Sequence, residues 1–173
     1  SRGNELDLLD RHYECAREYD ATIVAKIPSD VPLVDPQLID EVFEVYFTGE
    51  YDYVSNLHPP TFPDGLDVEV FSFEVLETTW REATASYERE HTTPYMWDNP
   101  DRFRIGAVTT EDGINYFISH RWTIDYQEDY EFIREVYKEI GRNNPGFTWK
   151  ELVEFLDENP RISEINRHLR GSN

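Results

Sequence analysis

The sequence predicts a layered α/β domain with a largely parallel sheet. Short segments rich in branched and aromatic residues alternate with longer segments whose apolar residues recur every three or four positions. Such alternation is typical of strands joined by crossover helices. The 173 residues are a common length for one domain, and 39% of them are hydrophobic, which is enough for a packed core. We therefore expect a single domain over residues 1–173.

Helix start and stop signals define the expected helices. Asp35 before a proline is a typical N-cap. Asp125 with Glu128, and Thr148 with Glu151, have the spacing of capping boxes. The expected helices cover residues 5–19, 35–49, 72–83, a stretch from 86 that is interrupted at Pro94, 125–141, a stretch from 148, and 162–169.

The most informative expected strand follows the turn Pro63-Asp64-Gly65. Alternation then places Val68 and Val70 on one face and Asp67 and Glu69 on the other. Two neighbouring carboxylates repel each other, so water, a sugar hydroxyl, a cation or a basic partner must offset that cost. The other expected strands are 21–27, 51–55, 103–108 and 120–124.

The charge excludes several kinds of partner. Sixteen Lys and Arg residues against 36 Asp and Glu residues give a net charge of -20, which disfavours binding to nucleic acid and to anionic membranes. Cys15 is the only cysteine, so an intrachain disulfide is excluded and the reducing cytoplasm is the expected location. The five histidines are scattered, without zinc-ligand spacing.

Two aspartates are the first candidates for chemistry. Asp30 follows the expected strand 21–27, and Asp125 follows 120–124. Ligands of α/β sheets bind beyond the carboxyl ends of the strands, and two carboxylates that meet there suit Mg²⁺. The structural alternatives are that Asp125 only caps its helix and that Asp30 only forms a turn with Pro32.

Further candidates occur in polar segments. Segment 87–95 reads either as a solvated helix face with Glu–Arg pairs or as a sugar or carboxylate pocket in which Glu90 accepts and His91 donates. Arg121 reads either as a phosphate ligand or as a strand-end ion pair. Asn56 lies in a loop after a strand, where ligand contacts are frequent.

Six segments carry a resemblance to a known family. They are RGNELDLLDR (2–11), SDVPLVDP (29–36), YDYVSN (51–56), PDGLDVEVF (63–71), EREHTTPY (88–95) and RWTID (121–125). In order and spacing the chain resembles, over nearly its whole length, the cytidylyltransferases of spore-coat polysaccharide biosynthesis, which are relatives of the CMP-sugar synthetases.

The resemblance implies a three-layer αβα sandwich like that of the nucleotide-diphospho-sugar transferases. It implies transfer of a cytidylyl group from CTP to a sugar or sugar acid, with release of pyrophosphate. Asp30 and Asp125 match the positions that hold Mg²⁺ in relatives. The implied substrate-binding residues are Asn56, Asp64, Asp67, Glu69, Glu90, His91 and Arg121, and Gly3 matches a position near the cytosine.

The chain departs from the family pattern at several points. Pro28-Ser29 replaces the usual Thr-Gly before the metal-binding aspartate, and Tyr126-Gln127 replaces the usual Thr-Pro after Asp125. Family members open with a strand and a Gly-rich loop that cradles the triphosphate, and this chain contains no such loop. We therefore expect the chain to begin partway through the family's domain.

Two other functions remain open at this stage. One is a metal-dependent glycosyltransferase, although that class favours Asp-x-Asp and Asp30 is followed by Val31-Pro32. The other is a non-catalytic fragment that associates with itself through an exposed sheet edge, for example as a homodimer.

Overall fold

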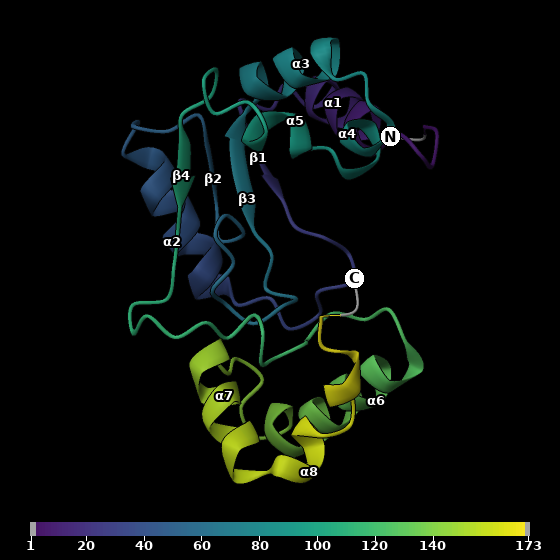
Figure 1. Cartoon of the computed structure of the whole chain (residues 1–173), viewed down its shortest axis with the longest axis vertical. Helices are drawn as coiled ribbons and strands as arrows, with labels where there is room; N and C mark the ends of the chain where they lie inside the picture. The colour runs from purple at the N-terminus through teal and green to yellow at the C-terminus, as the bar shows by residue number, and fades with distance from the viewer. Residues whose placement is uncertain (1–2, 172–173) are drawn as a thin grey trace. The chain divides into compact units, whose positions relative to one another are not determined.

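The computed structural model describes residues 3–171, which form two compact units (Figure 1). The first unit comprises residues 3–26, 42–55 and 69–108, and the second comprises 27–41, 56–68 and 109–171. Helix α2 (Pro36–Phe47) begins in the second unit and ends in the first. No helix among the described residues combines the length and the apolar character that crossing a membrane requires.

The first unit contains a four-stranded sheet of strands β1 (Ile23–Lys26), β2 (Tyr53–Ser55), β3 (Glu69–Ser72) and β4 (Ile105–Ala107). Its order is β1-β3-β2-β4. β3 is antiparallel to both of its neighbours, whereas β2 and β4 are parallel.

The expectation of a largely parallel sheet is therefore wrong. A parallel neighbour requires a crossover connection, usually a helix. Residues 56–68 between β2 and β3 contain no helix, so β3 returns beside β2 in the opposite direction. The α/β class is confirmed, with a mixed sheet.

Helices α1, α3 and α4 gather together in the first unit (Figure 1). The Ser72 hydroxyl caps α3 by accepting from the Val75 amide at 3.1 Å. Tyr13 of α1 stacks on Trp80 of α3, with ring centroids 4.1 Å apart. The helices of this unit, besides the end of α2, are α1 (Leu8–Glu18), α3 (Phe73–Glu82), α4 (Ser86–His91) and α5 (Pro94–Trp97).

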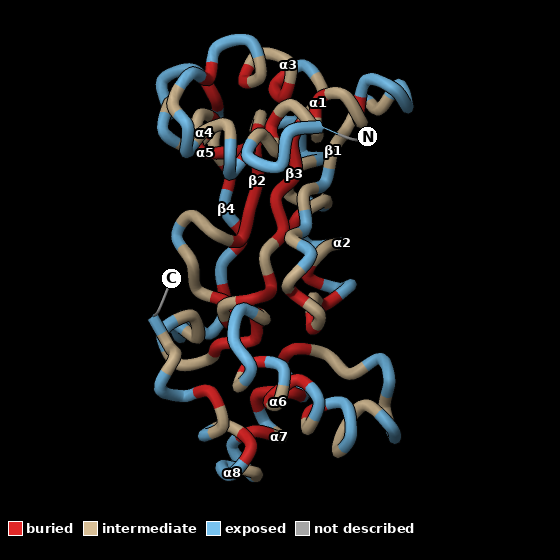
Figure 2. The backbone as a smooth tube through the Cα atoms, turned by 90° about the vertical axis from the view of Figure 1, so that its right-hand side faces the viewer, coloured by how far each residue is buried: buried red, intermediate tan, exposed pale blue. Residues whose placement is uncertain are grey.

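The apolar core of the first unit joins these helices to the sheet. Strand β2 is buried along its length and β3 over residues 69–71, as the red tube in Figure 2 shows. Burial of aliphatic and aromatic side chains of this size is the main source of folding free energy. The core consists of Leu9, Tyr13, Ala16, Tyr53, Phe71, Val75, Leu76, Ala83, Met96 and Phe103.

The second unit is mainly helical. The Thr148–Glu151 capping box is confirmed, because the Glu151 carboxylate accepts from the Thr148 amide at 2.7 Å and the Thr148 hydroxyl accepts from the Glu151 amide at 3.2 Å. The expected helix 162–169 is instead two short elements. The elements are α6 (Gln127–Val136), a π-helical turn (Tyr137–Gly141), α7 (Trp149–Glu158), α8 (Pro160–Ser163) and a 3-10 turn (Arg167–Leu169).

Segment 120–124 is not a strand, contrary to expectation. It forms an isolated parallel bridge between Asp64 and Arg121. The Trp122 amide donates to the Asp64 carbonyl at 2.7 Å, but the Ile124 amide donates to the Asp30 carbonyl at 2.9 Å. Because the segment pairs with two different stretches of chain, no ladder forms, and the segment instead brings those two stretches together.

Gly65 makes this arrangement sterically possible. Its φ is +100°, a conformation that side chains disfavour. A Cβ atom there would lie 2.5 Å from the Thr123 nitrogen and 2.6 Å from the Trp122 carbonyl carbon. The missing side chain lets the loop 56–68 pack directly on the backbone of segment 120–124.

Gly65→Ala should destabilise the protein by about 2–5 kcal/mol, because overpacking adds to left-handed backbone strain. Gly113→Ala is the matched control, since Gly113 also has a positive φ, +71°, but nothing within 4 Å of a Cβ atom. It should cost only about 1–2 kcal/mol. Urea unfolding of both variants measures the difference, and equal losses would contradict the close approach at Gly65.

Candidate functional site

The buried guanidinium of Arg121 lies among three aspartates of the second unit. Its Nε donates to Asp129 Oδ1 at 3.1 Å, and its Nη2 donates to Asp129 Oδ2 at 3.1 Å. The same Nη2 donates to Asp125 Oδ2 at 2.5 Å. Asp64 Oδ2 lies 3.6 Å from Nη1. The Arg121 side chain is 1% exposed, so these carboxylates replace water as its partners.

Asp30 is the fourth acid of this group. Its carbonyl accepts from the Ile124 amide at 2.9 Å, and its Oδ2 lies 3.4 Å from the Thr123 hydroxyl. Its negative charge also contributes to raising the pKa of Asp64. We call Arg121 with the aspartates 30, 64, 125 and 129 the Arg121 cluster. The Ile124 amide, one residue before Asp125, thus contacts the Asp30 backbone, and a meeting of the two carboxylates at one cation stays a prediction.

The charges within the cluster do not balance, since three carboxylates contact one guanidinium and the Asp30 carboxylate lies near enough to Asp64 to affect its pKa. Burial raises the pKa of Asp64, and the neighbouring aspartates raise it further against the opposing effect of Arg121. Burial also acts to raise the pKa of Asp129, but hydrogen bonds from Arg121 and Asn166 outweigh it and leave that pKa lowered. The cluster therefore carries an excess of negative charge that favours a cation.

The acids of the cluster differ in their access to solvent. Asp125 has a side chain 46% exposed and Asp30 is partly exposed, whereas Asp129 is fully buried. Within residues 3–171, no three His, Cys, Asp or Glu side chains form a ready-made metal cage. Mg²⁺ typically takes one or two protein carboxylates and completes its shell with water and phosphate oxygens. Asp30 and Asp125 would hold such an ion.

Glu69 was expected to face a ligand, but the structure places its side chain in the interior. It is fully buried, with Lys26 Nζ on one carboxylate oxygen and the Tyr53 hydroxyl 2.6 Å from the other. β3 therefore has no solvent-facing acidic side at Glu69. Of the possible partners that could offset the repulsion, a basic side chain is the one observed. Asp67 precedes β3 and is partly exposed.

Asn56 organises a loop. It is buried, its Nδ2 donates to the Leu66 carbonyl at 2.8 Å, and its Oδ1 accepts from the Val68 amide at 2.9 Å. The side chain therefore bridges both ends of the loop 56–68, which carries Asp64 and Gly65. A substrate contact by Asn56 stays a prediction.

The predicted residues of segment 87–95 lie in the first unit. Glu90 and His91 are exposed on α4. The guanidinium of Arg89 already has partners within the protein. Its Nη2 pairs with Asp7 Oδ2 at 2.8 Å, and its Nη1 donates to the Trp80 carbonyl. Gly3 is exposed, and a Cβ atom there would lie 2.9 Å from Arg11 Cγ. Roles for these residues in substrate or cytosine binding stay predictions.

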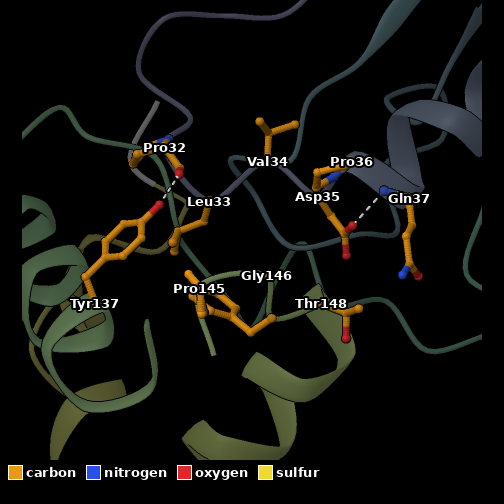
Figure 3. Close-up of a pocket in the computed structure, with 11 residues that line it drawn as sticks. Pro32, Leu33, Val34, Asp35, Pro36, Gln37, Tyr137, Pro145, Gly146 and Thr148 are labelled. Atoms are coloured by element: carbon orange, nitrogen blue, oxygen red, sulfur yellow. Dashed lines mark hydrogen bonds between the residues drawn. The ribbon is translucent and has the colours of Figure 1, made fainter. Parts of the chain in front are cut away.

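A pocket of about 290 Å³ also lies in the second unit (Figure 3). Segments 32–37 and 145–148 line it together with Tyr137, whose hydroxyl donates to the Pro32 carbonyl at 2.8 Å. Asp35 Oδ1 accepts from the Gln37 amide and Oδ2 from the Trp149 amide, both at 2.8 Å. Asp35 thus caps α2 and joins it to the start of α7, so it builds the wall of the pocket.

The comparisons with known proteins identify the family. Residues 1–159 match the family model described as Cytidylyltransferase. The chain belongs to the cytidylyltransferase family. The predicted resemblance is thereby confirmed, and the residues of the Arg121 cluster all fall within the matched part.

Individual relatives of the chain support the family assignment. An uncharacterised protein of Methanocaldococcus jannaschii, MJ1063, is 34% identical over 98% of the chain and 67% of its own length. The spore coat polysaccharide biosynthesis protein SpsF of Bacillus subtilis is 29% identical over 92% of the chain and 65% of its own length. The chain thus spans about two thirds of these relatives.

A solved structure shares the fold. The cytidylyltransferase of Leptospira borgpetersenii superimposes with a TM-score of 0.84 over 94% of this chain and 67% of the other, at 30% identity. The fold assignment therefore rests on similarity in both sequence and structure.

Two residues of the cluster region were missed in the sequence. Asp129, rather than Glu128, completes the capping box, because its Oδ2 accepts from the amides of Asp125 and Tyr126, both at 3.1 Å. The spacing Tyr126–Asp129 could have indicated this, but tyrosine is not a usual cap residue. Asn166 donates to Asp129 Oδ1 at 2.9 Å across 37 residues of sequence, and no local pattern predicts such a contact.

Lys26→Met should destabilise the protein by about 3–5 kcal/mol, because it leaves the buried Glu69 without a compensating charge. Lys150→Met is the matched control, since Lys150 pairs with Glu111 at 3.6 Å and both side chains are mostly exposed. The control should unfold close to the wild type. Urea denaturation is the measurement, and an unchanged midpoint for Lys26→Met would refute the role of the pair.

His12 should make stability depend on pH. Burial lowers its pKa below 6.5, partly offset by the hydrogen bond from Nδ1 to the Leu8 carbonyl at 2.7 Å. The buried neutral imidazole contributes fully to stability at a pH above 6.5, the pKa of His12 in the unfolded chain. This contribution decreases as the pH falls from that value through the lower pKa of the folded protein. In urea titrations between pH 7.5 and pH 5, His12→Gln should lose stability less steeply than the wild type. Identical slopes would contradict this.

Proposed function

We propose that the protein to which this chain belongs transfers a cytidylyl group from CTP to a sugar or sugar acid and releases pyrophosphate. The observation that carries this proposal is the Arg121 cluster in a member of the cytidylyltransferase family. It presents partly exposed carboxylates, Asp30 and Asp125, at a place with excess negative charge. Nucleotidyl transfer uses such acids to bind the cation that accompanies a triphosphate.

The residues of the chain contribute mainly by binding and orientation. Bound at Asp30 and Asp125, Mg²⁺ would supply neutralisation of the negative charge on the phosphates. The hydrogen bond between the Ile124 amide and the Asp30 carbonyl keeps the segments of these two acids together. Alignment of the sugar oxygen with the α-phosphorus would provide much of the rate enhancement.

The relatives indicate only the chemical class of the molecule that accepts the cytidylyl group. SpsF is described as a spore coat polysaccharide biosynthesis protein, so we propose that the activated sugar enters a surface polysaccharide. Asp64 and Asp67 of the second unit remain proposed sugar-binding residues, and Glu90 and His91 of the first unit are proposed as such separately. Membership of the cytidylyltransferase family argues against the glycosyltransferase alternative. A cytoplasmic location and a homodimer are part of the same proposal.

An assay of the complete gene product tests the function. With CTP, Mg²⁺ and a panel of sugars and sugar acids, the wild type should release pyrophosphate and form a CMP-sugar that mass spectrometry detects. Asp30→Asn and Asp125→Asn should each lower kcat/KM about a hundredfold or more, because each removes a proposed cation ligand. Asp40→Asn, at an exposed position of α2, is the control with the same charge change.

Two results would argue against the proposal. One is a wild-type protein that releases no pyrophosphate with any acceptor tested. The other is a pair of active Asp30→Asn and Asp125→Asn variants whose kcat/KM equals that of the Asp40→Asn control.

A further inference from the structure

Asp129 makes more hydrogen bonds than any role as a helix cap requires. Both of its oxygens accept from Arg121, and Oδ2 also accepts from the amides of Asp125 and Tyr126. Oδ1 accepts from Asn166 at 2.9 Å. The side chain is 0% exposed. Asp129 therefore cannot contact a dissolved ligand, yet it contacts both the backbone and the cationic partner of Asp125.

The charge of Arg121 creates a difficulty for the proposed site. A guanidinium 2.5 Å from Asp125 Oδ2 neutralises that carboxylate and repels a divalent cation. Asp129 opposes this repulsion because its carboxylate accepts hydrogen bonds from both Nε and Nη2 of Arg121. With Asp129 charged, the guanidinium already has a buried counter-ion, so Asp125 retains negative charge for another partner.

The same contacts fix the position of Asp125. Asp129 holds the Asp125 amide, while Arg121 holds its carboxylate. Asn166 connects the two supports, because its Nδ2 donates to the Arg121 carbonyl and to Asp129 Oδ1, both at 2.9 Å. The buried side chains of Arg121 and Asp129 thus fix the orientation of the exposed part of Asp125.

We propose that Asp129, supported by Asn166, is a positioning residue for cytidylyl transfer: it neutralises Arg121 and holds Asp125 so that this carboxylate can bind the divalent cation of the nucleotide. The proposal rests on the function proposed above. Residues that hydrogen-bond to a metal ligand without touching the metal typically lower metal affinity about 10–100-fold when they are removed.

Direct cation binding tests the proposal. Mn²⁺ is titrated into the complete protein with CTP present, and electron paramagnetic resonance measures the free ion. Asp129→Asn should raise the Kd for Mn²⁺ about tenfold or more. Glu131→Gln is the matched control, since it removes one negative charge from a partly exposed position on the same helix, and its Kd should equal that of the wild type.

A kinetic readout separates positioning from a general loss of structure. Asp129→Asn should raise the Mg²⁺ concentration needed for half-maximal activity, and excess Mg²⁺ should restore much of kcat. A variant that is only partly unfolded would not regain activity with added cation. Asn166→Ala keeps the Asp129 carboxylate but removes its support, so it should shift the Kd in the same direction by a smaller factor.

The outcomes are distinguishable. Weaker Mn²⁺ binding by Asp129→Asn than by Glu131→Gln supports the proposal. Equal binding by a folded Asp129→Asn overturns it while leaving the proposed function intact. If Asp129→Asn does not fold, an unchanged Kd for Asn166→Ala overturns it instead. A wild type that binds no Mn²⁺ with CTP refutes the cation site of the proposed function, and the role of Asp129 with it.

Discussion

The ion pair between Arg121 and Asp129 is the interaction on which the candidate site depends. Both side chains are buried, so each would be costly without the other. Their pairing allows a positive charge to lie inside the second unit, where it attracts Asp64 and Asp125 into one group. The irregular segment 120–124 thereby keeps a defined conformation without a β-ladder. The order of the site comes from charge pairing and the backbone bond to Asp30, more than from regular secondary structure.

The first unit solves a similar electrostatic problem in a different way. Glu69 enters a buried strand, and Lys26 and Tyr53 from the two neighbouring strands satisfy its carboxylate. No exposed acid remains at that position to meet a substrate. In the Arg121 cluster, by contrast, the acids outnumber the base, and Asp125 stays half exposed. An acid that is fully paired and buried stabilises the fold, whereas a partly exposed acid in an unbalanced group remains available for binding.

Sequence reasoning succeeded where local chemistry determines the outcome and failed where distant contacts do. The Thr148–Glu151 cap follows from neighbouring residues and is observed. The direction of β3 depends on which strands it pairs with, so the expected parallel sheet was wrong. A backbone hydrogen bond joins Asp30 to Ile124, the neighbour of Asp125, although segment 120–124 is not the strand that was expected there. The contact of Asn166 with Asp129 joins remote parts of the chain, and no periodicity or motif encodes it.

The central claim is that the carboxylates of the Arg121 cluster receive a nucleotide-bound cation. A crystal structure of the complete protein with CTP and Mn²⁺ tests this most directly, because the anomalous signal locates manganese independently of the surrounding density. The account predicts a manganese peak coordinated by Asp30 and Asp125, with Arg121 still paired to Asp129. A manganese peak bound to the triphosphate but away from both aspartates would contradict it.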